Sequence, residues 1–172
     1  MPTLTTNTAP GNVATLAGKY LTFVLAEEAY GIPVLKVREI IRLTAITTVP
    51  QMPGYIRGVI NLRGKIIPVM DLRLRFGCAG AANTDENCIV VVQVKNPSGL
   101  AMAMGLVVDA VEEVAQLTAA DIEESPDFGA QIDTQYILGM AKIKGVVKAL
   151  LDIDRVIGGD AVADLATTDL SR

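Results

Sequence analysis

The chain has 172 residues, of which 51% are hydrophobic, and it carries a formal net charge of −4 without any histidine. The lack of histidine excludes Ser-His and Cys-His catalytic dyads and histidine metal sites, and no eighteen-residue apolar stretch could form a transmembrane helix. Four Tyr, three Phe and a pI of about 4.8 argue against nucleic-acid binding.

Both ends of the chain have the composition of tails. Residues 1–18 are rich in Thr, Ala, Asn and Gly, without a charged leader or an apolar block, so we expect a flexible tail rather than a signal peptide. Residues 158–172 alternate Asp, Ala and Thr, and we expect them to fray or form a weak helix. Cys78 and Cys88 lack metal-ligand spacing, which indicates reduced thiols in a cytoplasmic protein.

The first half of the chain predicts short strands separated by glycine, proline and polar turns. Strands are expected at residues 20–25, 31–34 and 37–43, a hairpin rich in β-branched residues at 55–72, and one helical turn at 72–76. Arg63 lies in the turn of the hairpin. Its charge is either simply solvated there or, because short loops on rigid β scaffolds carry recognition residues, part of a binding site.

The second half predicts the same arrangement. Strands are expected at residues 88–94, 102–108 and 111–117, a hairpin at 136–153, and a helical turn at 151–157. Each half therefore offers about five short strands, which favours an all-β fold built as small closed barrels or sandwiches.

The hairpin sequence occurs twice, because YIRGVINLRGKIIPVMDL at residues 55–72 aligns with YILGMAKIKGVVKALLDI at residues 136–153 when shifted by 81 positions. Arg63 is matched there by Lys144, which keeps the positive charge but not the planar set of donors. The identical pairs include Tyr55 and Tyr136, Gly58 and Gly139, Gly64 and Gly145, and Asp71 and Asp152.

A second alignment supports an internal duplication. Shifted by 74 positions, residues 31–45 match residues 105–119 at seven of fifteen positions, where average residue usage gives roughly one. The change of shift implies seven extra residues in the second copy, which we expect in the polar stretch 121–135. A repeat of about 70 residues suits two copies of a small domain rather than a solenoid.

Charge is divided unevenly between the halves. Residues 1–78 contain nine Lys and Arg and four Asp and Glu, a net charge of +5. The residues from Ala79 onward contain six Lys and Arg and fifteen Asp and Glu, a net charge of −9, and the two sum to −4. This division either reflects independent drift of two solvated surfaces or orients a charged partner.

The sequence offers little for catalysis. Carboxylates are adjacent at Glu27 and Glu28, at Glu112 and Glu113, and at Glu123 and Glu124. Neighbouring residues of a strand point to opposite faces, so such a pair does not share one substrate atom. An enzyme of unknown type is therefore a distant alternative.

Residues 20 to 157 resemble the CheW family, the adaptors of bacterial chemotaxis arrays. The resemblance rests on four blocks in this order and spacing: YLTF from Tyr20, YGIPVLKVREI from Tyr30, VPQMPGYIRGVINLRGKIIPVMDLR from Val49, and GLVVDAVEEV from Gly105. Pro33 stands at a position that is often Asp in close relatives, which bears on the details of residues 30–34.

The resemblance implies a domain over residues 19–157, made of two five-stranded barrels related by a pseudo-twofold. The repeats would cover about 20–76 and 88–157, and strands can be exchanged between them. It also implies a protein without enzymatic activity or cofactor that couples chemoreceptor tips to the regulatory domain of the histidine kinase CheA. We expect a cytoplasmic protein, monomeric alone, that is recruited to membrane-associated receptor arrays.

The resemblance also assigns residues to receptor binding. Val37 and Glu39 match positions associated with receptor and kinase coupling, and Gly58 and Arg63 match positions whose alteration impairs receptor binding. An apolar groove between the barrels, which accepts the receptor's helical hairpin in the family, would be lined by Val34, Val37, Val107 and Val108. The sequence leaves structural alternatives open, because Gly58 recurs as Gly139, Glu39 recurs as Glu113, and the valines also suit a core.

Two adaptor functions fit this resemblance. The first is the chemotaxis adaptor itself, and the second is a related adaptor for a CheA-like kinase that controls twitching, gliding or another output. The sequence alone does not separate the two.

Overall fold

A computed structural model describes residues 16–76, 86–95, 99–123 and 136–157. Most of the two predicted tails, Cys78 and most of the predicted loop at 121–135 lie outside the described residues.

The described residues form strands with a few short helical turns, which confirms the predicted all-β fold. The first half contains β1 (Gly18–Leu25), β2 (Glu28–Pro33), the 3-10 turn η2 (Val34–Lys36), β3 (Val37–Arg42), β4 (Ile56–Leu62), β5 (Lys65–Asp71) and α1 (Leu72–Arg75). The second half contains β6 (Cys88–Lys95), β7 (Ala101–Val108), β8 (Ala110–Leu117), the 3-10 turn η3 (Ala119–Asp121), β9 (Ile122–Glu123), β10 (Ile137–Ile143), β11 (Val146–Leu151) and α2 (Ile153–Ile157).

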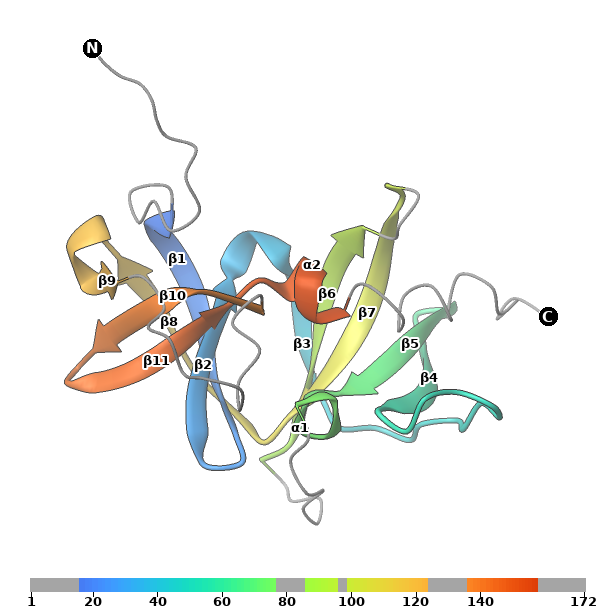
Figure 1. Cartoon of the computed structure of the whole chain (residues 1–172). Coiled ribbons are helices and arrows are strands. Elements are labelled where there is room, and N and C mark those ends of the chain that lie inside the picture. Colours follow the sequence, from blue (N-terminus) through green and yellow to red (C-terminus); the bar gives the residue numbers. More distant parts are fainter. Residues whose placement is uncertain (1–15, 77–85, 96–98, 124–135, 158–172) are drawn as a thin grey trace.

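The strands form two sheets, and each sheet takes strands from both halves of the chain (Figure 1). We call the sheet with the order β8-β1-β2-β11-β10-β9 barrel 1, and the sheet with the order β3-β6-β7-β5-β4 barrel 2. When each strand of barrel 1 except β9 is replaced by the strand at the equivalent position of the other sequence repeat, the result is the strand order of barrel 2. The predicted duplication of two barrels is therefore confirmed. The short strand β9 is an addition that the sequence did not predict.

The pairing register follows the two sequence shifts. In barrel 1, Leu150 of β11 pairs in parallel with Gly31 of β2, and in barrel 2, Val69 of β5 pairs in parallel with Gly105 of β7. Val69 and Leu150 are 81 positions apart, and Gly31 and Gly105 are 74 positions apart, so the two pairs are equivalent in the two repeats. Both glycines allow close packing, since a Cβ atom at Gly105 would lie 2.8 Å from the side chain of Ile89.

Each barrel is closed by the segment that follows one edge strand of its sheet, because this segment pairs with a strand at the opposite edge. In barrel 2, Thr47 forms a bridge with Val59 of β4, and in barrel 1, β9 pairs with β10. Gly58 lies at an irregularity in β4 with φ +144, and a Cβ atom there would lie 2.0 Å from the carbonyl oxygen of Thr47. Gly58 is therefore required by the closure of barrel 2.

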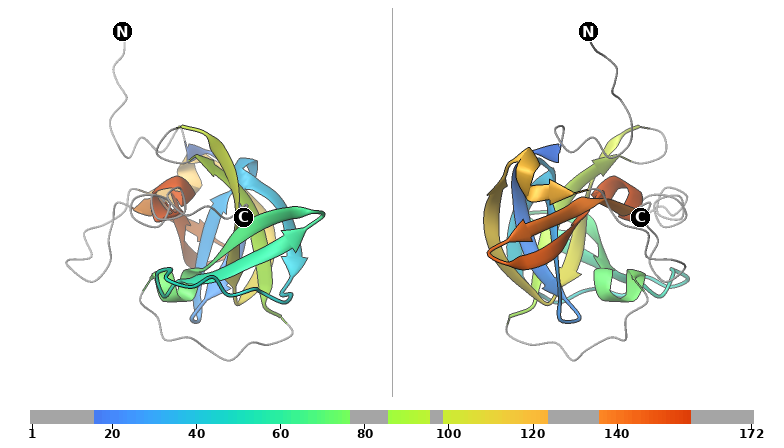
Figure 2. Two further views of the ribbon diagram at one scale, coloured as in Figure 1. Left: turned by 90° about the vertical axis from the view of Figure 1, so that its right-hand side faces the viewer. Right: turned by 60° about the vertical axis from the view of Figure 1, so that its left-hand side comes forward.

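Buried apolar residues in the described part of the chain form three clusters. One lies inside barrel 1 and includes Tyr20 and Leu150, and one lies inside barrel 2 and includes Ile67 and Val91. The third takes residues from both barrels, among them Phe23. In Figure 2, the left view looks onto barrel 2 and the right view brings barrel 1 forward, and in both views the two barrels lie against one another. The space between the barrels is thus part of the core.

Ion pairs also join the barrels where the chain passes between them, after β2 and after β7. Asp109, after β7, accepts a hydrogen bond from Arg73 of α1 at 3.0 Å. Lys36, after β2, donates to Asp154 of α2 at 2.6 Å. Arg73 and Asp154 occupy the same position of the two copies, 81 residues apart, so the two ion pairs have opposite polarity.

Candidate protein-interaction site

The turn that joins β4 and β5 holds Arg63 in a fixed position. Arg63 and Gly64 have φ values of +50 and +86, as a two-residue hairpin turn with the twist of the strands requires. The Asn61 side-chain oxygen accepts a hydrogen bond from the Gly64 N–H at 2.9 Å. As a result, Arg63 projects from the end of barrel 2 with 71% of its side chain exposed.

Arg63 pairs with Glu39 of β3 through two parallel contacts. Nη1 of Arg63 donates to Oε1 of Glu39 at 3.1 Å, and Nη2 donates to Oε2. The hydrogen bond from Arg63 lowers the pKa of Glu39 below its ordinary value, and the same contact raises the pKa of Arg63. The pair joins the tip of the hairpin to the opposite edge strand, and it brings together two residues that the family resemblance assigned to partner binding.

The same ion pair occurs in barrel 1. Lys144 takes the place of Arg63 and donates to Glu113 at 3.2 Å. Lys144 and Gly145 also have positive φ values, +53 and +80. The pairing therefore belongs to the duplicated fold, whereas the planar, two-point contact belongs only to barrel 2.

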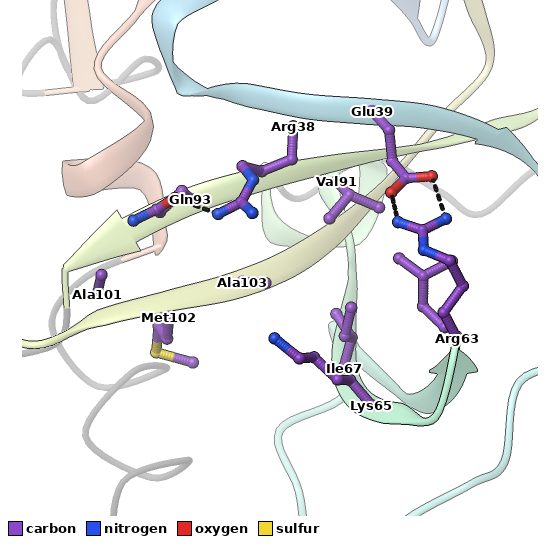
Figure 3. A pocket seen from close by; sticks show the side chains of 11 residues that line it. Arg38, Glu39, Arg63, Lys65, Ile67, Val91, Gln93, Ala101, Met102 and Ala103 are labelled. Carbon is purple, nitrogen blue, oxygen red and sulfur yellow. Dashed lines mark hydrogen bonds and ion pairs between the residues drawn. The ribbon is translucent and has the colours of Figure 1, made fainter.

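A pocket of about 380 Å³ opens at this end of barrel 2 (Figure 3). Ile67 and Val91, which are buried in the barrel core, form part of its apolar wall. Arg38 donates to the side chain of Gln93 at its edge. The lining consists of Arg38, Glu39, Leu62, Arg63, Lys65, Ile67, Val91, Gln93, Ala101, Met102 and Ala103.

The 3-10 turn η2 and the first residue of β3 place two of the predicted valines at the surface between the barrels. Val34 and Val37 are half-buried and pack against the cluster shared by the barrels. Leu35 between them is 98% exposed. Leu35 is not among the residues predicted from the sequence, although a large apolar residue in a short connection is a signal for an interaction site.

The other three predicted residues lie below the surface. Val107 is fully buried inside barrel 2, and Val108 is fully buried in the cluster between the barrels, so neither lines an open groove in this structure. The reason is that successive residues of β7 point to opposite sides, and both sides are core. Gly58 is buried at the closure of barrel 2.

Among the described residues, no cluster of three or more Cys, Asp or Glu side chains could hold a metal ion. None of the helices among these residues is long and apolar enough to span a membrane.

Comparisons with known proteins agree on one family. The family model of the CheW-like domain matches residues 19–160. The chemotaxis protein CheW of Klebsiella aerogenes is 36% identical over 87% of this chain and 87% of its own length, and that of Rhizobium meliloti is 33% identical over 83% and 94%. The crystal structure of the scaffolding protein TtCheW from Thermoanaerobacter tengcongensis superposes with a TM-score of 0.73 at 35% identity and covers 84% of this chain and 95% of its own.

A relative with a different name also matches. Protein FrzA of Myxococcus xanthus is 29% identical over 77% of this chain and 79% of its own length.

Proposed function

This chain belongs to the CheW family of chemotaxis scaffold proteins, and from that premise we propose that it is a non-enzymatic adaptor that couples chemoreceptor tips to the regulatory domain of CheA. The observation that carries the proposal is the extent of the family match, which includes both barrels and both short α-helices, α1 and α2. A CheW adaptor works by binding, so its chemistry lies in the surfaces of the two barrels. Its expected location is the cytoplasmic face of membrane-associated receptor arrays.

For the receptor we propose a surface that runs from the 3-10 turn along β3 to the hairpin tip of barrel 2. Val34 and Val37 contribute apolar area at the passage between the barrels, and Glu39 and Arg63 contribute a fixed ion pair. Val108 is buried in the cluster against which Val34 and Val37 pack, whereas Val107 lies inside barrel 2 and Gly58 lies against Thr47. An apolar strip beside a preorganised polar pair is suited to a helical hairpin, because burial gives affinity and the charges give orientation.

The kinase regulatory domain is expected to use another face, so that both partners bind at once. The test is a titration of a receptor cytoplasmic fragment against the adaptor with saturating kinase regulatory domain, and the reverse. A ternary complex supports the adaptor mechanism. Displacement of one partner by the other from a shared surface contradicts it.

A second candidate function is an adaptor for a CheA-like kinase with an output other than chemotaxis. This candidate is supported by the match to Protein FrzA, a relative that is not named as a chemotaxis protein. Deletion of the gene followed by assays of swimming, twitching and gliding distinguishes the two outputs.

A further inference from the structure

The helices α1 and α2 occupy equivalent positions in the two sequence repeats and contact each other at the centre of the molecule. In Figure 1 both helices lie between the strands of barrel 1 and those of barrel 2. Arg75 of α1 and Val156 of α2 are 81 positions apart, so they are the same position of the two repeats. Nε of Arg75 donates a hydrogen bond to the carbonyl oxygen of Val156 at 3.0 Å. Equivalent residues can touch only close to the pseudo-twofold axis that relates the repeats, so Arg75 lies near that axis.

Arg75 also contacts both members of a second equivalent pair. Its guanidinium group lies over the ring of Tyr55, 5.0 Å from the centroid, and over the ring of Tyr136, 5.4 Å from the centroid. Nη2 of Arg75 donates to the hydroxyl oxygen of Tyr136 at 3.0 Å. Tyr55 precedes β4 of barrel 2, and Tyr136 precedes β10 of barrel 1. One side chain therefore joins the two barrels through both copies of the same tyrosine.

The residue equivalent to Arg75 is not a cation. Val156 is fully buried and belongs to the cluster shared by the barrels. Two guanidinium groups this close to the axis would repel each other, and burial would strengthen the repulsion. The two repeats thus keep both tyrosines but hold them with a single arginine.

The neighbouring residue Phe76 extends this contact into barrel 1. Its ring centroid is 5.9 Å from that of Tyr30 in β2 and 6.3 Å from that of Tyr136, and Tyr30 lies 6.1 Å from Phe23 in β1. Together with Tyr55, these rings make up five of the seven aromatic residues of the chain. Contacts between aromatic rings, and between a ring and a cation, depend on geometry, so this row of side chains favours one orientation of the barrels.

We propose that Arg75 is a positioning residue that holds the two barrels in the relative orientation that receptor binding requires. This inference rests on the proposed function, because the proposed receptor surface begins at η2, where the chain passes from barrel 1 to barrel 2. Lys36 of η2 is paired with Asp154 of α2, two residues before the carbonyl group that accepts the hydrogen bond from Arg75. Arg75 thus acts on the receptor surface through α2. If its loss allows other orientations, the apparent receptor affinity falls with the fraction of molecules that keep the competent one.

The first measurement is the distance between the barrels in the full chain. Spin labels are attached at Lys95→Cys in barrel 2 and Lys142→Cys in barrel 1, two exposed positions, after Cys78→Ser and Cys88→Ser have removed the native thiols. Double electron–electron resonance is expected to give one narrow distance distribution for this labelled chain. Adding Arg75→Met should broaden the distribution or shift its maximum.

Arg75→Met is suited to this test because it removes the contacts of the guanidinium group without leaving a buried charge. The two hydrogen-bond acceptors of Arg75 are a carbonyl oxygen and a hydroxyl oxygen, both uncharged. Arg75→Lys should restore the distribution only in part, because an ammonium group lacks the planar set of donors. Arg155→Met is the matched control, since Arg155 is an exposed arginine of α2 beside Val156, and it should leave the distribution unchanged. All variants are measured well below their melting temperatures, so that a change of orientation is separated from unfolding.

The second measurement is the affinity of the unlabelled variants for a receptor cytoplasmic fragment, by calorimetry. If Arg75→Met leaves about one tenth of the molecules in the competent orientation, the receptor affinity falls about tenfold. Arg75→Lys should lie between Arg75→Met and wild type, and Arg155→Met should match wild type. The order of the affinities should therefore follow the order of the distance distributions.

The outcomes separate the role of Arg75 from the adaptor function. Unchanged distances in Arg75→Met overturn the positioning role, and so do changed distances with unchanged receptor affinity. If the wild-type chain binds neither receptor fragment nor kinase regulatory domain, the adaptor function is wrong, and the distances alone decide whether Arg75 sets the orientation of the barrels.

Discussion

Barrels 1 and 2 have the same strand order, pairing register and hairpin turns, but they carry different charges at equivalent positions. Arg73 corresponds to Asp154, and each finds an opposite charge at a passage between the barrels. Backbone geometry tolerates little variation, because a turn with two positive φ values or a close strand crossing accepts few residue types. The sign of a charge can change when the group that it pairs with changes too, so the two copies can have one fold and bind different proteins.

The largest expected difference concerns the two ion pairs that join the barrels. Arg73 exposes 1% of its side chain and bonds to Asp71 at 2.9 and 3.0 Å and to Asp109 at 3.0 Å. Arg73→Met leaves the buried Asp71 with Arg57 as its remaining cation, and we expect it to lower the free energy of unfolding by about 3–5 kcal/mol. Urea unfolding measures this loss.

The matched substitution in the other ion pair is Lys36→Met. Lys36 and Asp154 expose 35% and 37% of their side chains, so the expected loss is below about 1 kcal/mol. Equal losses in the two variants contradict the view that burial distinguishes the two ion pairs.

The next prediction compares the glycines where the barrels close. Gly58→Ala must shift backbone atoms of Thr47 and adopt a φ of +144, and we expect it to lower the free energy of unfolding by about 3 kcal/mol. Gly139→Ala meets the carbonyl oxygen of Glu123 at 2.9 Å without a positive φ, so about 1 kcal/mol is expected. Thermal unfolding checks the order of the two, and a smaller effect at Gly58 would show that barrel 2 closes more loosely than described.

The sequence predicted the fold well because the duplication constrains the backbone twice. The repeated Tyr-to-Asp hairpin placed both turns, and the repeated glycine-led strand placed β2 and β7. Both shifts recur in the pairing of Leu150 with Gly31 and of Val69 with Gly105. The sequence allowed strands to be exchanged between the barrels, but it did not show which strands close which barrel, because that depends on long-range pairing.

The candidate site was harder to predict. The Glu39–Arg63 contact joins residues 24 positions apart and exists only because the barrel closes. An alternating strand pattern assigns one face to the core, but Val107 and Val108 are both buried because β7 has core on each side. Leu35 was missed because it lies in the short gap between the strands predicted at 31–34 and 37–43, where no site residue was expected. The receptor roles of the named residues stay predictions.

The third prediction compares the duplicated ion pairs at the barrel ends. Arg63→Ala is expected to leave the melting temperature nearly unchanged, because the pair is exposed, and to weaken receptor affinity by about 2 kcal/mol. Arg63→Lys should recover only part of that affinity, since it copies the contact of barrel 1. Lys144→Ala is the control and should change neither quantity. A large drop in melting temperature for Arg63→Ala with normal affinity in the folded fraction would assign the residue to the fold alone.

The smallest effect is expected from pH, and it depends on Asp71. Burial alone would raise the pKa of Asp71, but hydrogen bonds and charge from Arg73, with a further hydrogen bond from Arg57, lower it below the ordinary value of 3.8. A group with a lowered pKa in the folded state contributes its full stabilisation above the ordinary pKa and loses it as the pH falls through the folded-state value. The ionised carboxylate should therefore stabilise the chain at neutral pH and lose this effect in acid.

Asp71→Asn tests this dependence, and Asp152→Asn is the control because Asp152 is the equivalent residue of barrel 1 and exposes 28% of its side chain. The difference in free energy of unfolding between wild type and Asp71→Asn should be constant above about pH 5 and shrink as the pH falls below about 4. At neutral pH, Asp152→Asn should cost less free energy of unfolding than Asp71→Asn, because the Asp152 carboxylate is partly exposed to water. A difference for Asp71→Asn that grows toward acid would mean that burial, and not Arg73, controls the charge at the centre of the buried ion pair.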